Sequence, residues 1–300
     1  MGYHKPVLLN ESIEGLHIQP KGIYVDLTFG GGGHSREVLK KLGKHGRLIA
    51  FDQDQDAEAN VPDDRRIVFI GANFRYLKHY LRYHAIKKVD GILADLGISS
   101  HQIDRPERGF SFKSESVLDM RMDLRSRLEA SRVLNDYSRT DLARIFREYG
   151  ELKNAGAIAA ALEKQREMKP LLTTGDLEEA LRGFIPKSHP SKFLARVYQA
   201  LRIEVNHEVE SLREMLLQTA EAMRPGGRLV VITYHSIEDR LVKNYMRSGN
   251  LKGTVKKDFY GNVESPWRVI TRNVITPAPD EIEKNNRARS AKLRIAERVS

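Results

Sequence analysis

The feature that most constrains this chain is a run of four glycines, residues 30–33, between two short apolar segments that each end on an aspartate. The segments are Ile23–Asp26 and Arg47–Asp52, and the residues between the glycines and the second segment favour a helix. This order predicts a strand, a glycine turn, a helix and a second strand, the unit with which α/β proteins bind the adenosine half of a cofactor. Glycines let the main chain approach the ligand, and Asp52 can accept hydrogen bonds from both ribose hydroxyls.

The glycine turn differs from the usual dinucleotide pattern, which spaces three glycines as GxGxxG. Here Asp26 and Thr28 precede four consecutive glycines, and Thr28 stands where a first glycine is expected. This arrangement is more similar to the S-adenosylmethionine loop of Rossmann-like methyltransferases than to a pyrophosphate site. The alternative is a flexible loop between two core strands, and the presence of Asp52 at the expected distance argues against it.

The bulk properties of the chain are those of a globular protein. Its 300 residues allow one large domain or two smaller ones, and 40% of them are hydrophobic. No apolar stretch approaches the roughly 20 residues needed to span a bilayer, and the first residues lack an apolar run followed by a cleavage site. We therefore expect a cytoplasmic protein without a membrane partner.

The chain contains no cysteine. This excludes disulfides, thiolate-bound zinc and a thiol nucleophile. Methylation of pyrimidine C5 generally requires a thiolate that attacks C6, so a base methylated by this protein would accept the methyl group on nitrogen or oxygen. No grouping of histidine, aspartate and glutamate has the spacing of metal ligands, and we therefore expect no essential metal.

Positive charge is concentrated toward the C-terminal end of the sequence. The formal net charge is +10, and residues 240–300 carry 14 Lys and Arg against 6 Asp and Glu. A basic tail on a cofactor-binding enzyme favours a nucleic acid substrate held partly through its phosphates. A solvated basic surface without such a partner is the alternative.

The order of the expected elements indicates an α/β fold with an insertion. Strands are expected at Ile23–Asp26, Arg47–Asp52, Ile67–Ile70 and Val89–Asp95, with helices starting near His34, Gln55 and Phe74, and later strands at Arg228–Tyr234, Trp267–Thr271 and Ala291–Ala296. Between them, from about residue 104 to 205, helical periods dominate and strand signals are nearly absent. We predict a Rossmann-like domain formed by residues 1–103 and 206–300, interrupted by an inserted helical domain at 104–205.

Ligands of open α/β sheets bind beyond the carboxyl ends of the strands. The side chains that follow the expected strands are therefore the candidates for the site: His34, Asp52, Phe74, Asp95 and His235. Structural alternatives remain open, because Phe74 and His34 can be helix-start residues and His235 can precede a helix. A buried carboxylate at the end of an apolar strand, such as Asp95, needs polar partners.

Seven motifs in a fixed order make a family resemblance specific. They are DLTFGGGGHS (26–35), DLGISS (95–100), ERGFSF (107–112), LDMRMD (118–123), QALRIEVN (199–206), YHSIEDR (234–240) and RARSAKLRIAER (287–298). Together they resemble the RsmH (MraW) family of bacterial 16S ribosomal RNA cytosine-N4 methyltransferases, over nearly the whole chain. Asn286 departs from the proline that the family commonly has before RARS, and the segment between residues 239 and 285 is short and variable.

The resemblance implies a class I S-adenosylmethionine-dependent methyltransferase that modifies the exocyclic amine of a decoding-region cytosine in the 16S rRNA of the small ribosomal subunit. Its cofactor contacts, carried over position by position, fall on Gly32, Gly33, His34, Asp52, Phe74, Asp95 and Gln102. The oligomeric state is left open, a homodimer included.

The catalytic residues are not assigned by the sequence. Asp95, Ser99 and His235 are candidates. The turn after the fourth strand, Asp95 to Ile98, lacks the two prolines and the aromatic residue of many amino-methyltransferases. We expect the insertion to cover the cytosine pocket. Two other classes stay open at this point: an NAD-dependent oxidoreductase, and an RNA-binding assembly factor without catalytic activity.

Overall fold

The structure, a computed structural model, describes residues 6–299. The chain forms two compact units. The sheet unit joins Met1–Gly97 to Val209–Ser300, and the helical unit is Ile98–Glu208. The sequence predicted the corresponding boundaries at residues 104 and 205.

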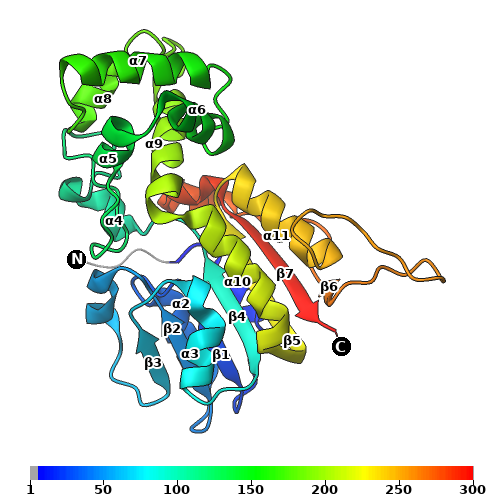
Figure 1. The fold of residues 1–300 in the computed structure, drawn as a ribbon. Helices are drawn as coiled ribbons and strands as arrows, with labels where there is room; N and C mark the ends of the chain where they lie inside the picture. The colour runs from blue at the N-terminus through cyan, green and yellow to red at the C-terminus, as the bar shows by residue number, and fades with distance from the viewer. Residues whose placement is uncertain (1–5, 300) are drawn as a thin grey trace. The chain divides into compact units, whose positions relative to one another are not determined.

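The sheet unit is built on a seven-stranded sheet in the order β3-β2-β1-β4-β5-β7-β6 (Figure 1). The strands are β1 (Ile23–Asp26), β2 (Arg47–Phe51), β3 (Ile67–Ile70), β4 (Val89–Asp95), β5 (Met223–Thr233), β6 (Trp267–Val269) and β7 (Lys292–Arg298). The first five strands in the spatial order run parallel, whereas β7 is antiparallel to both β5 and β6. The α/β class expected from the sequence is confirmed.

Helices cover both faces of this sheet. They are α1 (Leu9–Gly15), α2 (Gly33–Lys41), α3 (Leu77–Tyr83), α10 (Glu208–Ala222), α11 (Ser236–Ser248) and α12 (Pro279–Lys284), with short 3-10 turns at Gln55–Asn60, Phe74–Tyr76 and Asn286–Ser290. Apolar residues of α1 and α2 form one buried cluster with alternate residues of the strands, such as Leu48, Leu93 and Ile232. Successive side chains of a strand point to opposite faces, and on the other face Phe51 contacts Tyr80 of α3.

Two elements of the sheet unit differ from the sequence expectation. Strand β5 begins at Met223, before the expected start at Arg228, and Met223 pairs with Val89. The pairing with β4 is irregular between Met223 and Arg228, where Gly226 has a φ of +82°. The helix expected near Gln55 is a 3-10 helix, capped by the Asp54 carboxylate, which accepts from the Asp56 N–H.

The helical unit contains six α-helices in the part of the chain that is described. They are α4 (Ser100–Asp104), α5 (Ala130–Asp136), α6 (Arg139–Glu148), α7 (Ala155–Met168), α8 (Thr174–Leu181) and α9 (Pro190–Asn206), with a 3-10 turn at Pro106–Arg108. Fully buried side chains at helical spacing, such as Leu142, Ile145 and Phe146 of α6, form its core. Helix α9 begins with Pro190 in its first turn, where proline is well tolerated.

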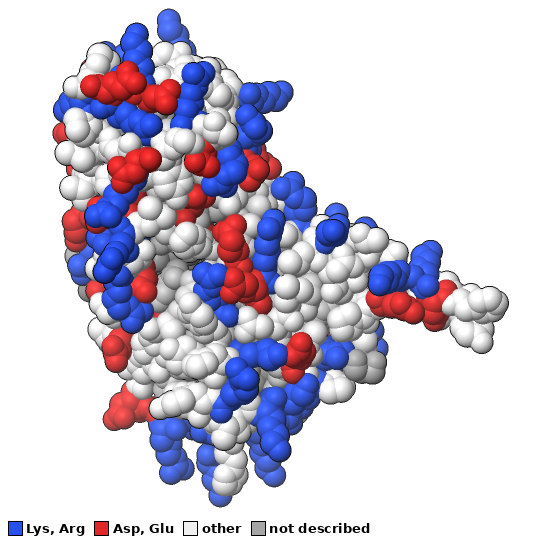
Figure 2. Space-filling view, in the orientation of Figure 1, with Lys and Arg blue, Asp and Glu red and all other residues white. Residues whose placement is uncertain are grey.

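Charged side chains of both signs are interspersed on the face shown in Figure 2. Among residues 6–299, no helix combines the length and the apolar character needed to cross a membrane.

Three of the family motifs meet inside the helical unit. The Arg108 guanidinium, from ERGFSF, is buried and donates to the main-chain carbonyls of Arg121 and Met122 at 2.9 and 3.1 Å. The Asn206 amide, at the end of QALRIEVN, donates to the Met120 carbonyl and accepts from the Met122 N–H. The LDMRMD segment, residues 118–123, is therefore held from two sides.

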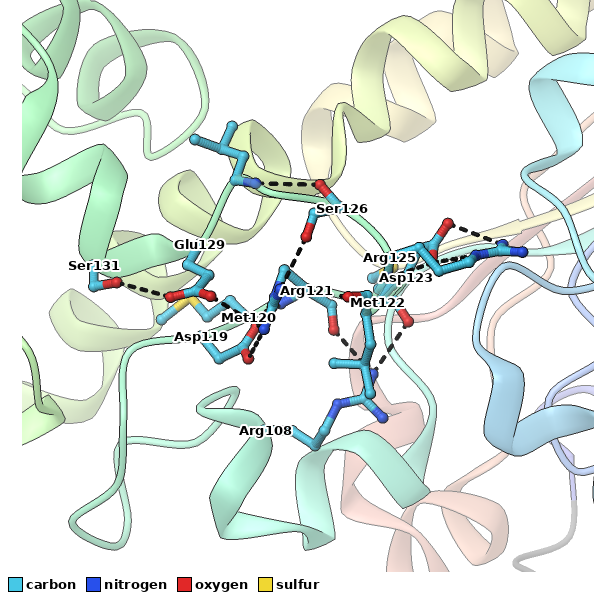
Figure 3. A network of polar contacts seen from close by, with 12 residues as sticks. Arg108, Asp119, Met120, Arg121, Met122, Asp123, Arg125, Ser126, Glu129 and Ser131 are labelled. Atoms are coloured by element: carbon cyan, nitrogen blue, oxygen red, sulfur yellow. Dashed lines mark hydrogen bonds and ion pairs between the residues drawn. The ribbon is translucent and has the colours of Figure 1, made fainter.

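The arginine within LDMRMD organises the next part of this network (Figure 3). Arg121 forms a two-point contact with the Asp119 carboxylate, with both N–O distances at 2.8 Å, and also lies 3.2 Å from Glu129. A third nitrogen donates to the Ser126 carbonyl at 2.9 Å. Two-point arginine–carboxylate contacts fix both orientation and distance, so the motif has a structural explanation that its sequence alone did not provide.

Candidate cofactor site at the strand ends

The glycine loop connects β1 to α2 with the main-chain geometry that glycine permits. Gly30 and Gly32 have φ values of +50° and +74°, in the left-handed region that other residues rarely adopt. A Cβ atom added to Gly32 would lie 2.7 Å from the Phe29 ring, and one added to Gly33 would lie 2.1 Å from Pro6. At Gly30 the same atom would meet open space. The loop therefore packs tightly on one side and leaves room beside Gly30.

Side chains from three elements hold this loop in place. The Asp52 carboxylate accepts from the Gly30 N–H at 2.7 Å, and the Asn60 amide donates to the Gly30 carbonyl at 3.2 Å. Arg36, in α2, donates to the carbonyls of Gly31 and Asn60 at 2.6 and 2.9 Å. The main chain at the loop is thus fixed before any ligand binds.

Asp26 is the last residue of β1, and its carboxylate contacts residues on both sides of the glycine loop. Its side chain is 1% exposed and accepts from the Thr28 N–H at 3.1 Å and from the Ser35 hydroxyl at 2.7 Å. Burial raises the pKa of Asp26 to about 6, against the effect of these two hydrogen bonds. Asp26 was predicted from the sequence as a strand-end residue but not as one of the cofactor contacts.

Asp52 lies directly after β2, where the sequence analysis placed a ribose-binding carboxylate. Besides the Gly30 N–H, it accepts the Asp54 N–H at 2.9 Å. Burial raises the pKa of Asp52 to about 6, and the nearby Asp54 and Asp26 add to the rise. Each carboxylate oxygen can accept more than one hydrogen bond, so ribose hydroxyls can donate to Asp52 without displacing the main-chain donors.

Asp95, at the end of β4, is joined to the first and the fifth strand. Its N–H donates to the Thr28 hydroxyl at 2.7 Å, and its carboxylate accepts from the Tyr234 hydroxyl at 2.8 Å. Burial raises the pKa of Asp95 to about 7; the Tyr234 hydrogen bond opposes this rise, and Asp26 and Glu238 add to it.

The three aspartates at the strand ends have no cationic side chain among the groups that shift their pKa values. Burial is the largest cause of each rise in pKa, and repulsion from the Asp26 carboxylate adds to the rise at Asp52 and Asp95. A cationic ligand would relieve this repulsion. S-Adenosylmethionine carries two positive groups, a sulfonium and an ammonium, and one negative carboxylate. Its net positive charge is the charge that such a site favours.

His34, in the first turn of α2, is 5% exposed. Burial lowers its pKa to about 4, so the imidazole is neutral near pH 7, and its Nδ1, 3.9 Å from the Asp95 carboxylate, makes no ion pair there. In the described part of the chain, its Nε2 has no hydrogen-bond partner. A buried polar atom without a partner costs free energy, and a ligand polar group beside α2 would satisfy it.

Phe74 follows β3 in a 3-10 turn capped by Asn73, whose side chain accepts from the Arg75 N–H. The Asn73 amide also donates to the side chain of Gln53 at 2.7 Å. This bond ties the segment that carries Phe74 to the residue directly after Asp52. The partly exposed Phe74 ring is thus held on the same edge of the sheet as the aspartates.

Two of the predicted site residues, Ser99 and Gln102, belong to the helical unit and not to the sheet unit. Ser99 is the N-cap of α4, and its side chain accepts from the Gln102 N–H while the Gln102 side chain accepts from the Ser99 N–H. This reciprocal pair is a capping box.

His235 precedes α11 as its N-cap residue and does not cap it with its side chain. Its Nε2 lies 3.1 Å from the Glu238 carboxylate, which also accepts the Tyr234 N–H at 3.0 Å.

Three residues that shape the site were not predicted from the sequence. Tyr234, the first residue of YHSIEDR, orients Asp95, while Arg36 and Asn60 hold the glycine loop. The position of Tyr234 after a strand was a usable signal. Arg36 and Asn60 are not part of a sequence motif that would have indicated their role, because they act by donating hydrogen bonds to main-chain carbonyls.

Three cations of the basic tail contact other parts of the sheet unit. Arg294, on β7, makes a two-point contact with Asp239 at 2.7 and 3.2 Å, and Lys292 lies 3.6 Å from the same carboxylate. Arg298 donates to the Ala220 carbonyl at 2.9 Å. These cations stabilise the fold, whereas Arg289 is exposed.

The strand order with its antiparallel β7, the glycine loop and the aspartates that end β1, β2 and β4 are those of a Rossmann-like domain, and with the family match that follows they define a methyltransferase that uses S-adenosylmethionine. The sequence matches the MraW methylase family over residues 1–299, and the chain belongs to that family. Family membership confirms the resemblance seen in the motifs and excludes the oxidoreductase alternative.

Close relatives cover the whole chain. A protein of Parabacteroides distasonis is 56% identical over 99% of this chain and 98% of its own length, and one of Flavobacterium johnsoniae is 53% identical over 100% and 99%. Both are named ribosomal RNA small subunit methyltransferase H. Among solved structures, an rRNA methylase of Streptococcus thermophilus is 11% identical over 97% of this chain and 94% of its own, with a TM-score of 0.42.

Proposed function

We propose that this protein transfers a methyl group from S-adenosylmethionine to the N4 amine of a decoding-region cytosine in 16S rRNA of the small ribosomal subunit. The observation that carries the proposal is the group of three aspartates at the strand ends, of which Asp52 holds the glycine loop, in a chain whose relatives are named for methylation of small-subunit RNA. The absence of cysteine supports a nitrogen acceptor, because C5 chemistry generally needs a thiolate.

The cofactor contacts we propose are Gly32, Gly33, His34, Asp52, Phe74, Asp95 and Gln102. Asp52 accepts hydrogen bonds from the ribose hydroxyls, and the partly exposed Phe74 ring packs beside the adenine. His34 is neutral and offers its unpartnered Nε2 to a polar group of the donor. Gln102 enters this set from the family resemblance alone.

S-Adenosylmethionine supplies a methyl group activated by a sulfonium centre. The chain must hold a poor nucleophile in line with it, since the lone pair of the cytosine amine is delocalised into the ring. Asp95, oriented by Tyr234, accepts a hydrogen bond from that amine and so favours its rehybridisation. As the nitrogen–carbon bond forms, the nitrogen becomes acidic, and a carboxylate whose pKa is about 7 suits the role of proton acceptor. Ser99 and His235 remain candidates for the base pocket.

We further propose that the helical unit recognises the RNA substrate and covers the cytosine. Its family motifs form one rigid network around residues 118–123, which suits a surface that must keep its shape. Deletion of residues 104–204 should leave donor binding measurable and abolish RNA methylation; normal turnover by the deletion variant would refute this role.

The proposed reaction is tested with labelled donor and small subunits from a strain that lacks the modification. We expect one labelled methyl group per subunit, recovered as N4-methylcytidine on nucleoside analysis. Label recovered in another nucleoside would refute the proposed acceptor. No incorporation, with donor binding intact, would favour the alternative of an RNA-binding factor without catalytic activity.

A further inference from the structure

An arm of the sheet unit carries two aromatic side chains at its tip. The arm, residues 251–266, connects α11 to β6 and extends away from the sheet (Figure 1). Phe259 is 96% exposed and Tyr260 is 85% exposed, more than any other large hydrophobic side chain that the structure describes. Aromatic rings of this size contribute strongly to binding when they are buried against a partner, and these two contribute nothing to the core.

The tip has a defined turn, although it lacks regular secondary structure. Lys257 and Val263 form an antiparallel bridge across the arm. The Asp258 carboxylate accepts from the N–H groups of Tyr260 and Asn262 at 2.9 and 2.8 Å, and from the Asn262 amide at 3.0 Å. Both oxygens of the Asp258 carboxylate therefore accept hydrogen bonds within the turn, and these bonds fix the main chain that carries the two rings.

The two rings are arranged edge to face. Their centroids lie 5.6 Å apart with an interplanar angle of 88°. Two rings held in this way point their faces in different directions, and both side chains remain more than four fifths exposed.

Cationic residues are frequent in the sequence before the aromatic tip. Six cationic side chains lie between residues 240 and 264, against two acidic ones, Asp258 and Glu264. All six are exposed: Arg240, Lys243, Arg247, Lys252, Lys256 and Lys257. Figure 2 shows the uncharged tip with charged side chains directly behind it on the arm.

We propose that this arm is a second RNA-contacting element, in which Phe259 and Tyr260 stack on unpaired nucleobases while the neighbouring lysines contact phosphates. Exposed aromatic rings beside cationic side chains are the combination with which proteins bind single-stranded nucleic acid. A protein partner would more often be met by a broader apolar patch with fewer cations. The proposal rests on the proposed function, because it takes RNA as the substrate.

The arm acts apart from the cofactor site. Strand β6 lies at the edge of the sheet, four strand positions from β1. At about 4.8 Å per position this is about 19 Å, and β4, which ends at Asp95, is about 14 Å from β6. Because the arm extends from this edge away from the sheet (Figure 1), the aromatic tip touches neither the glycine loop nor the aspartates. The arm therefore contributes to RNA affinity and leaves donor binding and the chemical step unchanged.

The test compares the full-length protein with the double variant Phe259→Ser and Tyr260→Ser. Stacking on one base changes affinity about five- to 150-fold, and we expect the double variant to bind undermethylated small subunits at least about tenfold more weakly. Its KM for subunits should rise, while kcat, donor affinity and melting temperature stay unchanged. Tyr83→Ser is the matched control, because Tyr83 is 78% exposed on another part of the sheet unit.

A second variant tests the phosphate contacts. Lys256→Gln with Lys257→Gln should lower the salt dependence of RNA affinity by about 1.4 in the slope of log K against log salt. Lys41→Gln with Lys44→Gln, two exposed lysines before β2, should leave the slope unchanged.

The experiments distinguish a wrong arm proposal from a wrong proposed function. If wild-type protein methylates subunits and the double serine variant has the same affinity and KM, the arm proposal is wrong. A variant that changes the oligomeric state but keeps its RNA affinity would show a contact between copies instead, and would also overturn it. Wild-type protein that neither binds nor methylates RNA would refute the proposed function, and the arm proposal with it.

Discussion

The raised pKa values at the strand ends predict how donor affinity depends on pH. If S-adenosylmethionine binds the ionised carboxylates, lowering the pH from 7 to 6 reduces the ionised fraction of Asp95 from about one half to about one tenth, given its pKa of about 7. Affinity should then fall about fivefold. Asp52 and Asp26, each with a pKa of about 6, fall from about nine tenths to one half ionised and extend the loss to about 18-fold. These limits correspond to about 1–1.7 kcal/mol.

The assay is titration calorimetry at pH 6.0, 6.5 and 7.0, a range in which the α-amino group of the donor stays mostly protonated. Repeating each titration in buffers of different ionisation enthalpy should reveal proton release on binding at pH 7. Asp95→Asn should lose about fivefold of the pH effect. Affinity that is constant over this range, or that rises as the pH falls, would refute the electrostatic argument.

The same shifts have a consequence for stability. A carboxylate whose pKa is raised in the folded state holds its proton more tightly there than in the unfolded chain, so these three carboxylates should contribute a loss of stability to the ligand-free protein as the pH rises from about 4 to about 7. His34, whose pKa burial lowers to about 4, should contribute a smaller gain over the same range. Saturating donor should oppose this loss, because it binds the folded state alone.

Three substitutions test the structure outside the cofactor site. Gly109→Ala should destabilise the protein by about 2–3 kcal/mol, because Gly109 has a φ of +70° and its new Cβ would lie 2.3 Å from the Val117 carbonyl oxygen; an unchanged melting temperature would contradict the packing described. Gly156→Ala, within α7 and facing open space, should instead stabilise it by about 0.5–1 kcal/mol. Arg294→Ala should lower the melting temperature, since it breaks the two-point contact with Asp239, and should leave RNA affinity unchanged; weaker RNA binding at an unchanged melting temperature would assign Arg294 to the RNA surface.

Much of the sheet could be predicted because its signals are local. Strands β1, β3 and β4 begin and end where short apolar runs do, and the aspartates that close β1 and β4 mark those ends in the sequence. Strand β5 began earlier than expected, since its pairing with Val89 continues past Gly226. A tertiary pairing of this kind overrides the turn preference of Pro-Gly-Gly, and no local pattern reports it.

The site was predictable only where a residue acts through its own position after a strand. Asp52 and Asp95 lie at the expected places, whereas the roles of Tyr234 and Arg36 depend on partners far away in the sequence. In the basic tail, Lys292 and Arg294 lie on a strand inside the sheet and pair with Asp239. The RNA contacts expected of the exposed cations of the tail stay a prediction. Charge composition cannot distinguish a cation that faces solvent from one that stabilises the fold.

The central claim is that the aspartates beyond the strands bind the methyl donor, and calorimetry of the donor with Asp52→Asn tests it most directly. Hydrogen bonds to a charged group contribute about 1.5–3 kcal/mol each. Wild-type protein should therefore bind one donor per chain, and Asp52→Asn should bind at least about tenfold more weakly. Asp63→Asn, an exposed acid nearby in sequence, should match the wild type. Wild-type protein that releases no heat with the donor, or Asp52→Asn that binds it as tightly as wild type, would contradict the account.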